Sequence, residues 1–320
     1  MKSIDELAKI SINFLSASIA PSTSRQYLSC LNRYVQFCQH YNLQVFPLIQ
    51  ENIILFVSYM STASISSIKL HVSAIKFYAQ IHGYDPSGNS FNSFHRLYLL
   101  LRGIKRTQGN RYRKQKRNPI TPEILKCIRF NLFNSSMLYE DKLMIWACML
   151  TAFFGFMRVS EYTSPRTVTY QPEITLCYHD FKVKENRNNI HIELSIKSSK
   201  TDPFRLGTVI RLAANVTELC PVKALLEYVK YHPLKQGPLF TFQNGKFLTR
   251  RELGKILQQH LPNSCRNISS HSFRIGAATT AAAAGHPRWL IQSLGRWTSD
   301  CFRQYLRIPD TTIDNVSNSL

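Results

Sequence analysis

The sequence predicts a mainly α-helical protein of two domains, with one small antiparallel sheet in the second domain. Apolar side chains recur at helical intervals over most of the chain, whereas the alternation typical of a strand is strong in one place only. A run of basic residues without apolar periodicity separates the two halves. At 320 residues the chain is also longer than most single domains. We therefore expect a helical domain over 1–107, a basic linker over 108–118 and a second domain over 119–320.

The first domain shows four helical segments. They cover 21–41, 53–60, 64–82 and 91–101. Ser22 or Thr23 is the expected N-cap of the first helix, and Gly83 is a stop signal after the third. The second of these segments is apolar on all sides and is expected to be buried.

The second domain begins with the helix start Thr121-Pro122-Glu123 and continues with an apolar, buried helix over 141–154. Its strand signal lies at 190–196, where isoleucine and leucine alternate with polar residues, and a second strand follows at 208–212. Further helices are expected over 222–231, 250–260, 272–284 and 287–294. This order predicts a small sheet inside a helical domain.

The charge of the chain indicates a polyanionic partner. Lys and Arg number 40 against 19 Asp and Glu, which gives a formal charge of +21, while 44% hydrophobic residues exclude a disordered chain. Eight basic side chains crowd the end of the first domain and the linker, and we expect them to lie along phosphates. They are Arg102, Lys105, Arg106, Arg111, Arg113, Lys114, Lys116 and Arg117. The alternatives are a solvated charge run or a nuclear import signal.

Membrane and metal signals are weak in this sequence. No apolar run approaches the about 20 residues of a spanning helix, and the segment MKSIDELAKISINFL is too polar for a secretory signal. The eight cysteines form no CxxC pair, and no HxxxH pair accompanies them. We expect a soluble, intracellular protein with free thiols, no metal and no cofactor.

The first candidate site residue is Arg158, which follows the buried helix in the segment FFGFMRVSEYT. A guanidinium at such a place needs an anionic partner, and Glu161 provides one in the structural interpretation. In the functional interpretation, Arg158 contacts two oxygens of a phosphate.

The next candidate is Lys200, in the turn of the expected hairpin, with Lys197 as its competitor. Either lysine is equally compatible with a solvated turn.

Two further candidates lie close together in the segment HSFR, where His271 and Arg274 are three residues apart and share one face of the expected helix. Near the C-terminus, the segment GRWTSDCFRQYLR contains the indole of Trp297 and the phenol of Tyr305. A phenol that lies near cationic groups is easier to deprotonate. These surroundings single out Tyr305 among the 15 tyrosines of the chain.

In order along the chain, R-x-x-E, SKTD, HSFR and GRW with a downstream tyrosine resemble the catalytic boxes of the tyrosine recombinases. The helical pattern that ends in LLLRGIKR is similar to the core-binding domain of these enzymes, so the resemblance covers about residues 20–307. The GRW segment looks closest to the DIRS-type and Crypton recombinases of eukaryotic mobile elements. One departure is that bacterial members usually have His where Trp297 stands and one more residue before the tyrosine.

The resemblance implies a SAM-like helical core-binding domain, a helical catalytic domain with a small antiparallel sheet, and strand exchange on double-stranded DNA by a tetramer in the nucleus. Tyr305 is implied to attack a DNA phosphate and form a 3′-phosphotyrosyl bond, without metal or cofactor. Arg158 and Arg274 are implied to hold the non-bridging oxygens. His271 is implied to accept the phenolic proton or to form a hydrogen bond with a phosphate oxygen. Trp297 is implied to donate its indole N–H beside it, and Lys200 to protonate the leaving 5′ oxygen. Glu161 is implied to orient its neighbours.

Two alternatives remain at this point. A type IB topoisomerase uses a similar set of cations and a tyrosine, but its chain resembles neither the GRW segment nor the first domain. A domesticated, catalytically silent DNA-binding protein derived from a recombinase is the second alternative. The presence of all six expected catalytic residues argues against it.

Overall fold

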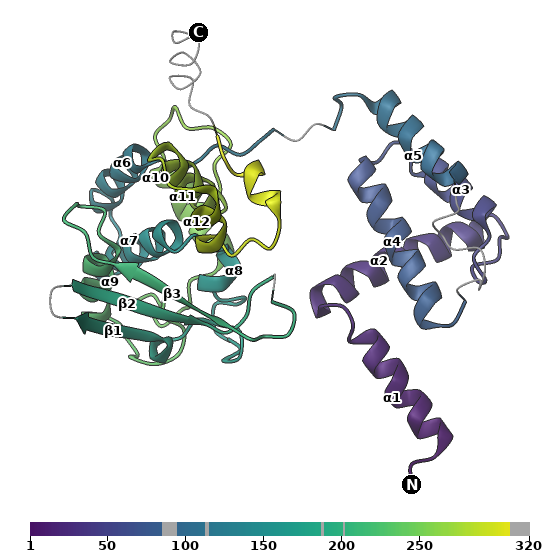
Figure 1. Ribbon diagram of the computed structural model, residues 1–320, viewed down its shortest axis with the longest axis horizontal. Coiled ribbons are helices and arrows are strands. Elements are labelled where there is room, and N and C mark those ends of the chain that lie inside the picture. The colour runs from purple at the N-terminus through teal and green to yellow at the C-terminus, as the bar shows by residue number, and fades with distance from the viewer. Residues whose placement is uncertain (85–94, 113–114, 187–188, 201, 308–320) are drawn as a thin grey trace. The chain divides into compact units, whose positions relative to one another are not determined.

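The computed structural model describes the chain except for residues 85–94, 113–114, 187–188, 201 and 308–320 (Figure 1). The chain divides into two compact units, Met1–Lys114 and Gln115–Leu320, and each has its own hydrophobic core. The division falls inside the segment 108–118, where the basic linker is expected. No helix in the described ranges is both long and apolar enough to cross a membrane.

The first unit is helical throughout its described part. Its helices are α1 (Ile4–Ser16), α2 (Pro21–His40), α3 (Gln50–Tyr59), α4 (Ile65–Ile81) and α5 (His95–Gln108). Helix α2 packs on α4, and α3 packs on α5. In the core, the ring of Phe56 lies edge-on to Tyr34 at 5.1 Å and to Phe37 at 5.3 Å between centroids. The buried aromatic side chains therefore come from the helical faces that the sequence pattern predicts.

Three details of this unit differ from expectation. Helix α2 starts at Pro21 with Ala20 as its N-cap, and neither Ser22 nor Thr23 caps it. Helix α5 continues to Gln108, whose side-chain amide donates to the carbonyl oxygens of Ser61 at 2.9 Å and Ala63 at 2.7 Å. Helix α1 was not expected; none of its residues is buried, and a capping box of Ser3 with Glu6 begins it.

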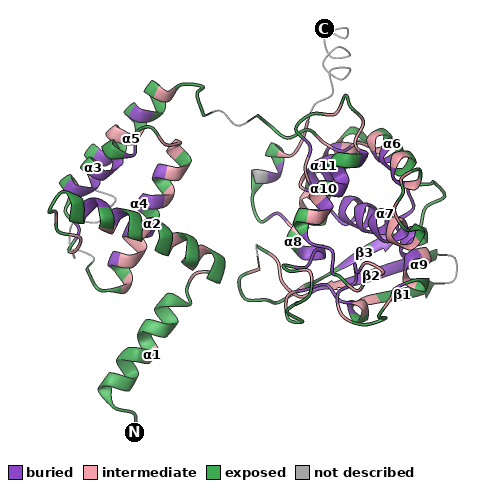
Figure 2. Ribbon diagram, turned by 180° about the vertical axis from the view of Figure 1, so that it is seen from behind, coloured by how far each residue is buried: buried purple, intermediate pink, exposed green. Residues whose placement is uncertain are grey.

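The second unit is built around the buried helix α7 (Tyr139–Phe154), whose residues 143–153 are all buried (Figure 2). The other helices of this unit are α6 (Pro122–Phe133), α8 (Val159–Tyr162), α9 (Pro221–Lys230), α10 (Arg250–His260), α11 (Ser272–Ala283) and α12 (Arg288–Leu294). Helices α6, α9 and α11 pack directly on α7. Two short 3-10 helices are η2 (Tyr178–Asp180) and η3 (Asp300–Gln304). The helical segments expected in this half therefore form a single core.

The sheet has three antiparallel strands in the order β1 (Phe181–Asn186), β2 (Asn189–Ile196) and β3 (Thr208–Ala213). In the register of β2 and β3, Ile192 pairs with Leu212 and Leu194 pairs with Ile210, so the alternating apolar residues cover one buried face. Strand β1 was not expected. It is an edge strand with mostly exposed side chains, and its apolar alternation is limited to Phe181 and Val183.

Helix α11 approaches the start of this unit very closely. The Ile120 amide donates to the Ser272 carbonyl oxygen at 3.1 Å, and a Cβ at Gly276 would lie 1.8 Å from the Ile120 carbonyl oxygen. No side chain fits there. The small residues of α11 therefore allow the helix that begins at HSFR to lie directly against backbone.

We predict that Gly276→Ala lowers the free energy of unfolding by about 1–3 kcal/mol, because the added methyl group forces α11 away from Ile120. The matched control is Gly254→Ala in α10, where a Cβ meets no atom within 4 Å. That change is expected to be neutral or stabilising, since alanine favours helix over glycine. Urea unfolding of both variants measures the difference, and equal stability of the two would contradict the packing argument.

Candidate active site

The site begins at the turn that ends α7. Phe156 has a left-handed backbone (φ +48°), and the Met157 amide donates back to the Ala152 carbonyl oxygen at 3.0 Å. Glycine is the usual residue at the position of Phe156 in a helix end of this kind. Arg158 is the N-cap of α8. Its backbone amide donates to Glu161 Oε2 at 2.9 Å and its Nη1 to Oε1 at 3.1 Å. The Glu161 side chain is fully buried, so the ion pair foreseen as the structural interpretation of Arg158 is present.

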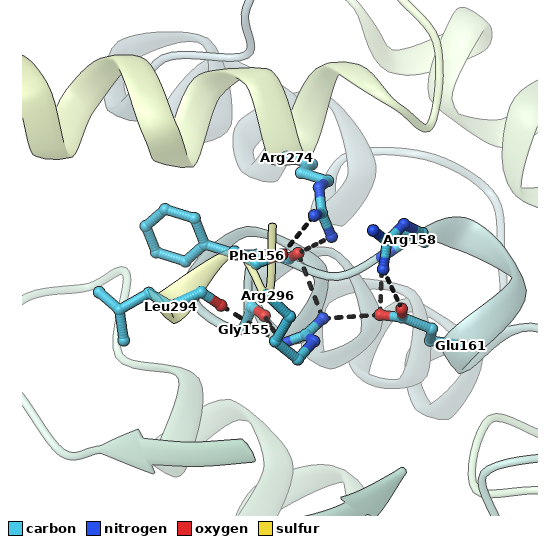
Figure 3. A network of polar contacts seen from close by, with 8 residues as sticks. Gly155, Phe156, Arg158, Glu161, Arg274, Leu294 and Arg296 are labelled. Atoms are coloured by element: carbon cyan, nitrogen blue, oxygen red, sulfur yellow. Dashed lines mark hydrogen bonds and ion pairs between the residues drawn. The ribbon is translucent and has the colours of Figure 1, made fainter. Parts of the chain in front are cut away.

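Arg274 extends from α11 and is completely buried. Its Nη1 donates to the Phe156 carbonyl oxygen at 2.7 Å and its Nη2 to that of Gly295. Burial, and then the charge of Arg158, lower the pKa of Arg274 to about 9, which leaves the guanidinium charged at neutral pH. Figure 3 shows the guanidinium groups of Arg274 and Arg158 near one another, the first on the Phe156 carbonyl oxygen and the second on the Glu161 carboxylate. Two cations are therefore held close together inside the protein.

Three aromatic side chains lie beside these arginines. The ring of Tyr305 is 5.2 Å from that of His271 and 5.0 Å from that of Trp297, between centroids. The Arg274 guanidinium lies over the Trp297 ring at 4.3 Å and over the Tyr305 ring at 5.9 Å. A Cβ at Gly295 would lie 1.7 Å from the indole, so only glycine allows Trp297 this position.

Tyr305 is fixed through its backbone and its neighbours in sequence. Its amide donates to the Phe302 carbonyl oxygen at 2.8 Å, and Phe302 is buried in the core. Thr279 of α11 donates its hydroxyl to the Tyr305 carbonyl oxygen at 3.2 Å. Helix α11 thus carries Arg274 and also holds the segment of Tyr305.

His271 is the N-cap of α11 and lies one residue before the helix begins. Burial lowers its pKa to about 4, and the nearby charges of Arg117, Arg274 and Arg158 act in the same direction. The imidazole is therefore neutral at pH 7 and keeps a nitrogen lone pair that can accept a proton.

The polar groups of the cluster are suited to an anion. Arg158 and Arg296 both pair with the carboxylate of Glu161, and the guanidinium of Arg274 shares the Phe156 carbonyl oxygen with Arg296. Within the described ranges, three buried donors of the cluster have no hydrogen-bond partner: Arg274 Nε, Arg296 Nε and Trp297 Nε1. Buried donors without an acceptor are costly, so an oxyanion between them would be stabilised.

Sequence reasoning overlooked Arg296, although it lies within the GRW segment. Its Nη2 contacts Glu161 Oε2 at 2.7 Å, and its side chain is only 17% exposed. An arginine between a glycine and a tryptophan gives no periodic signal. Only its contacts with residues about 140 positions earlier in the chain place Arg296 in this cluster.

The structure does not bring Lys200 into this cluster. Lys200 is exposed in the turn after β2, which the bridge between Ser199 and Asp202 closes. The competitor Lys197 is paired with buried Asp180 at 2.7 Å. Of the two lysines, Lys197 is thus engaged in the fold, and Lys200 has a solvent-exposed side chain.

The basic residues of the expected linker divide between the two units. Arg102, Lys105 and Arg106 are exposed on α5, and they are helical although their segment lacks apolar periodicity. Arg111 is exposed after this helix, and Lys116 and Arg117 are exposed at the start of the second unit. Arg113 and Lys114 lie outside the described residues. The described members of the set are all accessible to a partner.

Potential metal ligands gather at one place in the described ranges, where Cys177, His179 and Asp180 lie within 4.8 Å of one another. Asp180 accepts from the Cys177 amide at 2.8 Å and is also paired with Lys197. Since the ammonium group of Lys197 already balances this carboxylate, the contacts within the fold account for the placement of these three residues.

We predict that protonation of His271 destabilises the protein. The pKa of His271 is about 4 in the folded protein, whereas a histidine in an unfolded chain has a pKa of about 6.5. The neutral imidazole therefore leaves the free energy of unfolding undiminished above pH 6.5, and this stability is lost as the pH falls toward 4. Relative to His271→Gln, the wild type should lose about 1–3 kcal/mol of unfolding free energy between pH 7 and pH 4.5. Urea unfolding at several pH values measures this, and an imidazole that titrates near 6.5 by NMR would refute it.

No protein-family profile matches the chain, and no curated protein matches its sequence. Solved structures do match its fold. XerH site-specific recombinase, in a post-cleavage complex with a palindromic difH substrate, has a TM-score of 0.59 at 16% identity, over 92% of this chain and 78% of XerH. A lambda integrase dimer bound to a COC′ core site has a TM-score of 0.55 at 15% identity, over 96% of each chain.

The Tn1549 transposon integrase in complex with a circular intermediate DNA has a TM-score of 0.50 at 13% identity, over 91% of this chain and 99% of the integrase. Identities this low compare folds and leave activity open. The mainly helical architecture with its small three-stranded sheet is thus the fold of the tyrosine recombinases.

Proposed function

We propose that this protein cleaves and rejoins DNA, with Tyr305 as the nucleophile. One observation carries the proposal: the Tyr305 ring lies between a neutral imidazole and an indole, beside a completely buried guanidinium. A fold shared with structures of tyrosine recombinases supports it. The expected product is a 3′-phosphotyrosyl bond and a free 5′-hydroxyl group.

The arginines account for the charge that develops in this reaction. Attack of the phenolate oxygen adds negative charge to the two non-bridging oxygens of a pentacoordinate phosphorus. Arg158 and the Nε of Arg274 are proposed to hold these oxygens, with Trp297 Nε1 as a third donor. Because the donors are already held in place by the fold, little reorganisation is needed when the charge appears.

Proton transfers complete the reaction. Neutral His271 is proposed to accept the phenolic proton as the O–P bond forms. The departing 5′ oxygen takes a proton from Lys200, which is exposed on a turn and must reach the DNA when it binds. Reattack by a 5′-hydroxyl group restores the phosphodiester bond. The hydroxyl proton passes back to Lys200, and the proton held by His271 returns to Tyr305. The reaction as proposed conserves the bond energy and uses no cofactor.

Double-stranded DNA is the proposed partner, and a tetramer is the proposed assembly for strand exchange. A formal charge of +21 and exposed basic residues in both units support DNA binding. The matched XerH and lambda integrase structures contain DNA substrates, and the lambda integrase is a dimer on its site. Exchange between two duplexes needs four cleaving protomers, which is why a tetramer is proposed.

The biological setting is proposed to be a eukaryotic mobile element of the DIRS or Crypton type, with action in the nucleus. The GRW segment and its short interval to Tyr305 support this assignment. A transposon integrase is also among the structures with a similar fold. Basic tracts such as 111–117 are compatible with nuclear import.

We predict a covalent protein–DNA adduct that resists SDS when the protein is incubated with nicked suicide duplexes carrying the ends of its own element. The nick lets a short fragment diffuse away, so the phosphotyrosyl bond cannot be reversed. Tyr305→Phe removes the nucleophilic oxygen and should abolish the adduct. DNA binding without any adduct would favour a silent DNA-binding protein, and an undiminished adduct with Tyr305→Phe would exclude this tyrosine.

We predict that Arg158→Ala lowers the cleavage rate by about 100-fold or more and leaves salt-sensitive DNA binding largely intact. The fold should tolerate the change, because Glu161 keeps its ion pair with Arg296. Arg129→Ala is the control, since it removes an arginine from an exposed ion pair with Glu218. Single-turnover cleavage and binding titrations at several salt concentrations measure both effects. A parallel loss of binding and cleavage would contradict the assigned role.

A further inference from the structure

We propose that Arg296 is a positioning residue that holds Arg158 and Arg274 in the geometry needed for phosphate binding. That the ligand is a DNA phosphate follows from the proposed function. The contacts of Arg296 with the other residues are present in the protein without DNA. Arg296 does not contact the rings of Tyr305 or Trp297 in any described interaction. It is therefore assigned no chemical step of its own.

The backbone of Arg296 is the first observation. Helix α12 ends with the Trp297 amide donating to the Gln292 carbonyl oxygen at 3.1 Å and the Arg296 amide to that of Ser293 at 2.9 Å. Arg296 lies at the residue after the C-cap, with a left-handed φ of +54°. Glycine is the usual residue there, because a Cβ is disfavoured at this φ. An arginine kept against this preference indicates that its side chain has a function.

The side chain joins three parts of the site. From the end of α12, it reaches Glu161 of α8 at 2.7 Å, the Gly155 carbonyl oxygen at 3.1 Å and the Phe156 carbonyl oxygen at 3.4 Å. Figure 3 shows the Arg296 guanidinium between the Glu161 carboxylate and the turn after α7. These contacts tie two helix ends to one carboxylate.

Each proposed phosphate-binding arginine shares an acceptor with Arg296. Glu161 Oε1 accepts from the Arg158 side chain, and Oε2 accepts from Arg296 and from the Arg158 backbone amide, so Arg296 helps to hold the carboxylate with one oxygen turned toward the Arg158 guanidinium. The Phe156 carbonyl oxygen accepts from both Arg274 and Arg296. Loss of the Arg296 guanidinium would therefore remove one donor from each of these two acceptors at once.

Charge gives a second reason for this role. With Arg158 alone, Glu161 would form a neutral pair, and Arg158 would have little net attraction left for a phosphate. Arg296 draws on the same carboxylate, so the cluster of three arginines and one glutamate stays positive by two charges. A site built in this way positions Arg158 without neutralising it.

The test replaces Arg296 by glycine, which suits the left-handed backbone and removes only the side chain. We expect Arg296→Gly to lower the single-turnover cleavage rate at saturating DNA by about 100-fold, with DNA affinity changed less than about twofold. Methylguanidinium added at millimolar concentration should restore part of the rate, and methylammonium should not. Lys235→Gly is the matched control, because Lys235 is an exposed basic residue with a φ of +48°. It should cleave at the wild-type rate.

A second measurement is independent of catalysis. In the DNA-free wild type, the Nε–H NMR signals of Arg158 and Arg274 should be resolved, and Arg296→Gly should shift or broaden both, whereas Lys235→Gly should move neither. If Arg296→Gly unfolds, Arg296→Lys serves instead, because a lysine ammonium can pair with Glu161 but cannot also reach the carbonyl oxygens of Gly155 and Phe156. The Nε–H signals of Arg158 and Arg274 and the cleavage rate should then change in the same direction, to a smaller degree.

The outcomes separate the two proposals. If the wild type forms no adduct with DNA, the proposed function fails, while the NMR signals still decide whether Arg296 orders the other two arginines. If the wild type cleaves and Arg296→Gly cleaves at the same rate, or loses rate and DNA affinity equally, the positioning role is wrong. Unchanged arginine signals in the variant would likewise overturn it.

Discussion

A completely buried guanidinium, that of Arg274, sets the main physical constraint on the second unit. Removing such a cation from water costs several kcal/mol unless acceptors replace the lost hydration. Here the acceptors are carbonyl oxygens at the C-terminal ends of two helices, Phe156 after α7 and Gly295 after α12. The partial negative charge at a helix C-terminus favours a cation there. Both helix ends must therefore converge on α11 for the charge to be tolerated.

Glycines and small residues make this convergence possible. Gly276 lets α11 lie against the backbone of Ile120, and Gly295 leaves room for the Trp297 indole. Thr279 of the same helix holds the backbone of Tyr305. The cation, the aromatic rings and the candidate nucleophile are therefore attached to one rigid helix, which suits a reaction that depends on alignment more than on motion.

The same burial determines the protonation states. In this environment His271 stays neutral at pH 7, whereas Arg274 stays charged, because the pKa of an arginine side chain in water is far above that of an imidazole. A neutral base beside fixed cations differs from an ordinary basic surface, which would hold phosphates without activating a phenol. Exposed basic residues such as Arg106 and Lys116 form a surface of that ordinary kind.

From the sequence alone, periodicity determined most helices and the β2–β3 pair, since these depend on apolar faces that repeat locally. The order of the short motifs pointed to Arg158, His271, Arg274, Trp297 and Tyr305, and the structure brings these five together. Helix α1, which has no buried residue, carried a local capping signal in Ser3 and Glu6 that was overlooked. Only the tertiary structure decided that Lys200 is exposed while Lys197 pairs with Asp180, that β1 forms, and that Arg296 shares acceptors with two arginines. Such contacts join residues distant in the chain, and no local pattern encodes them.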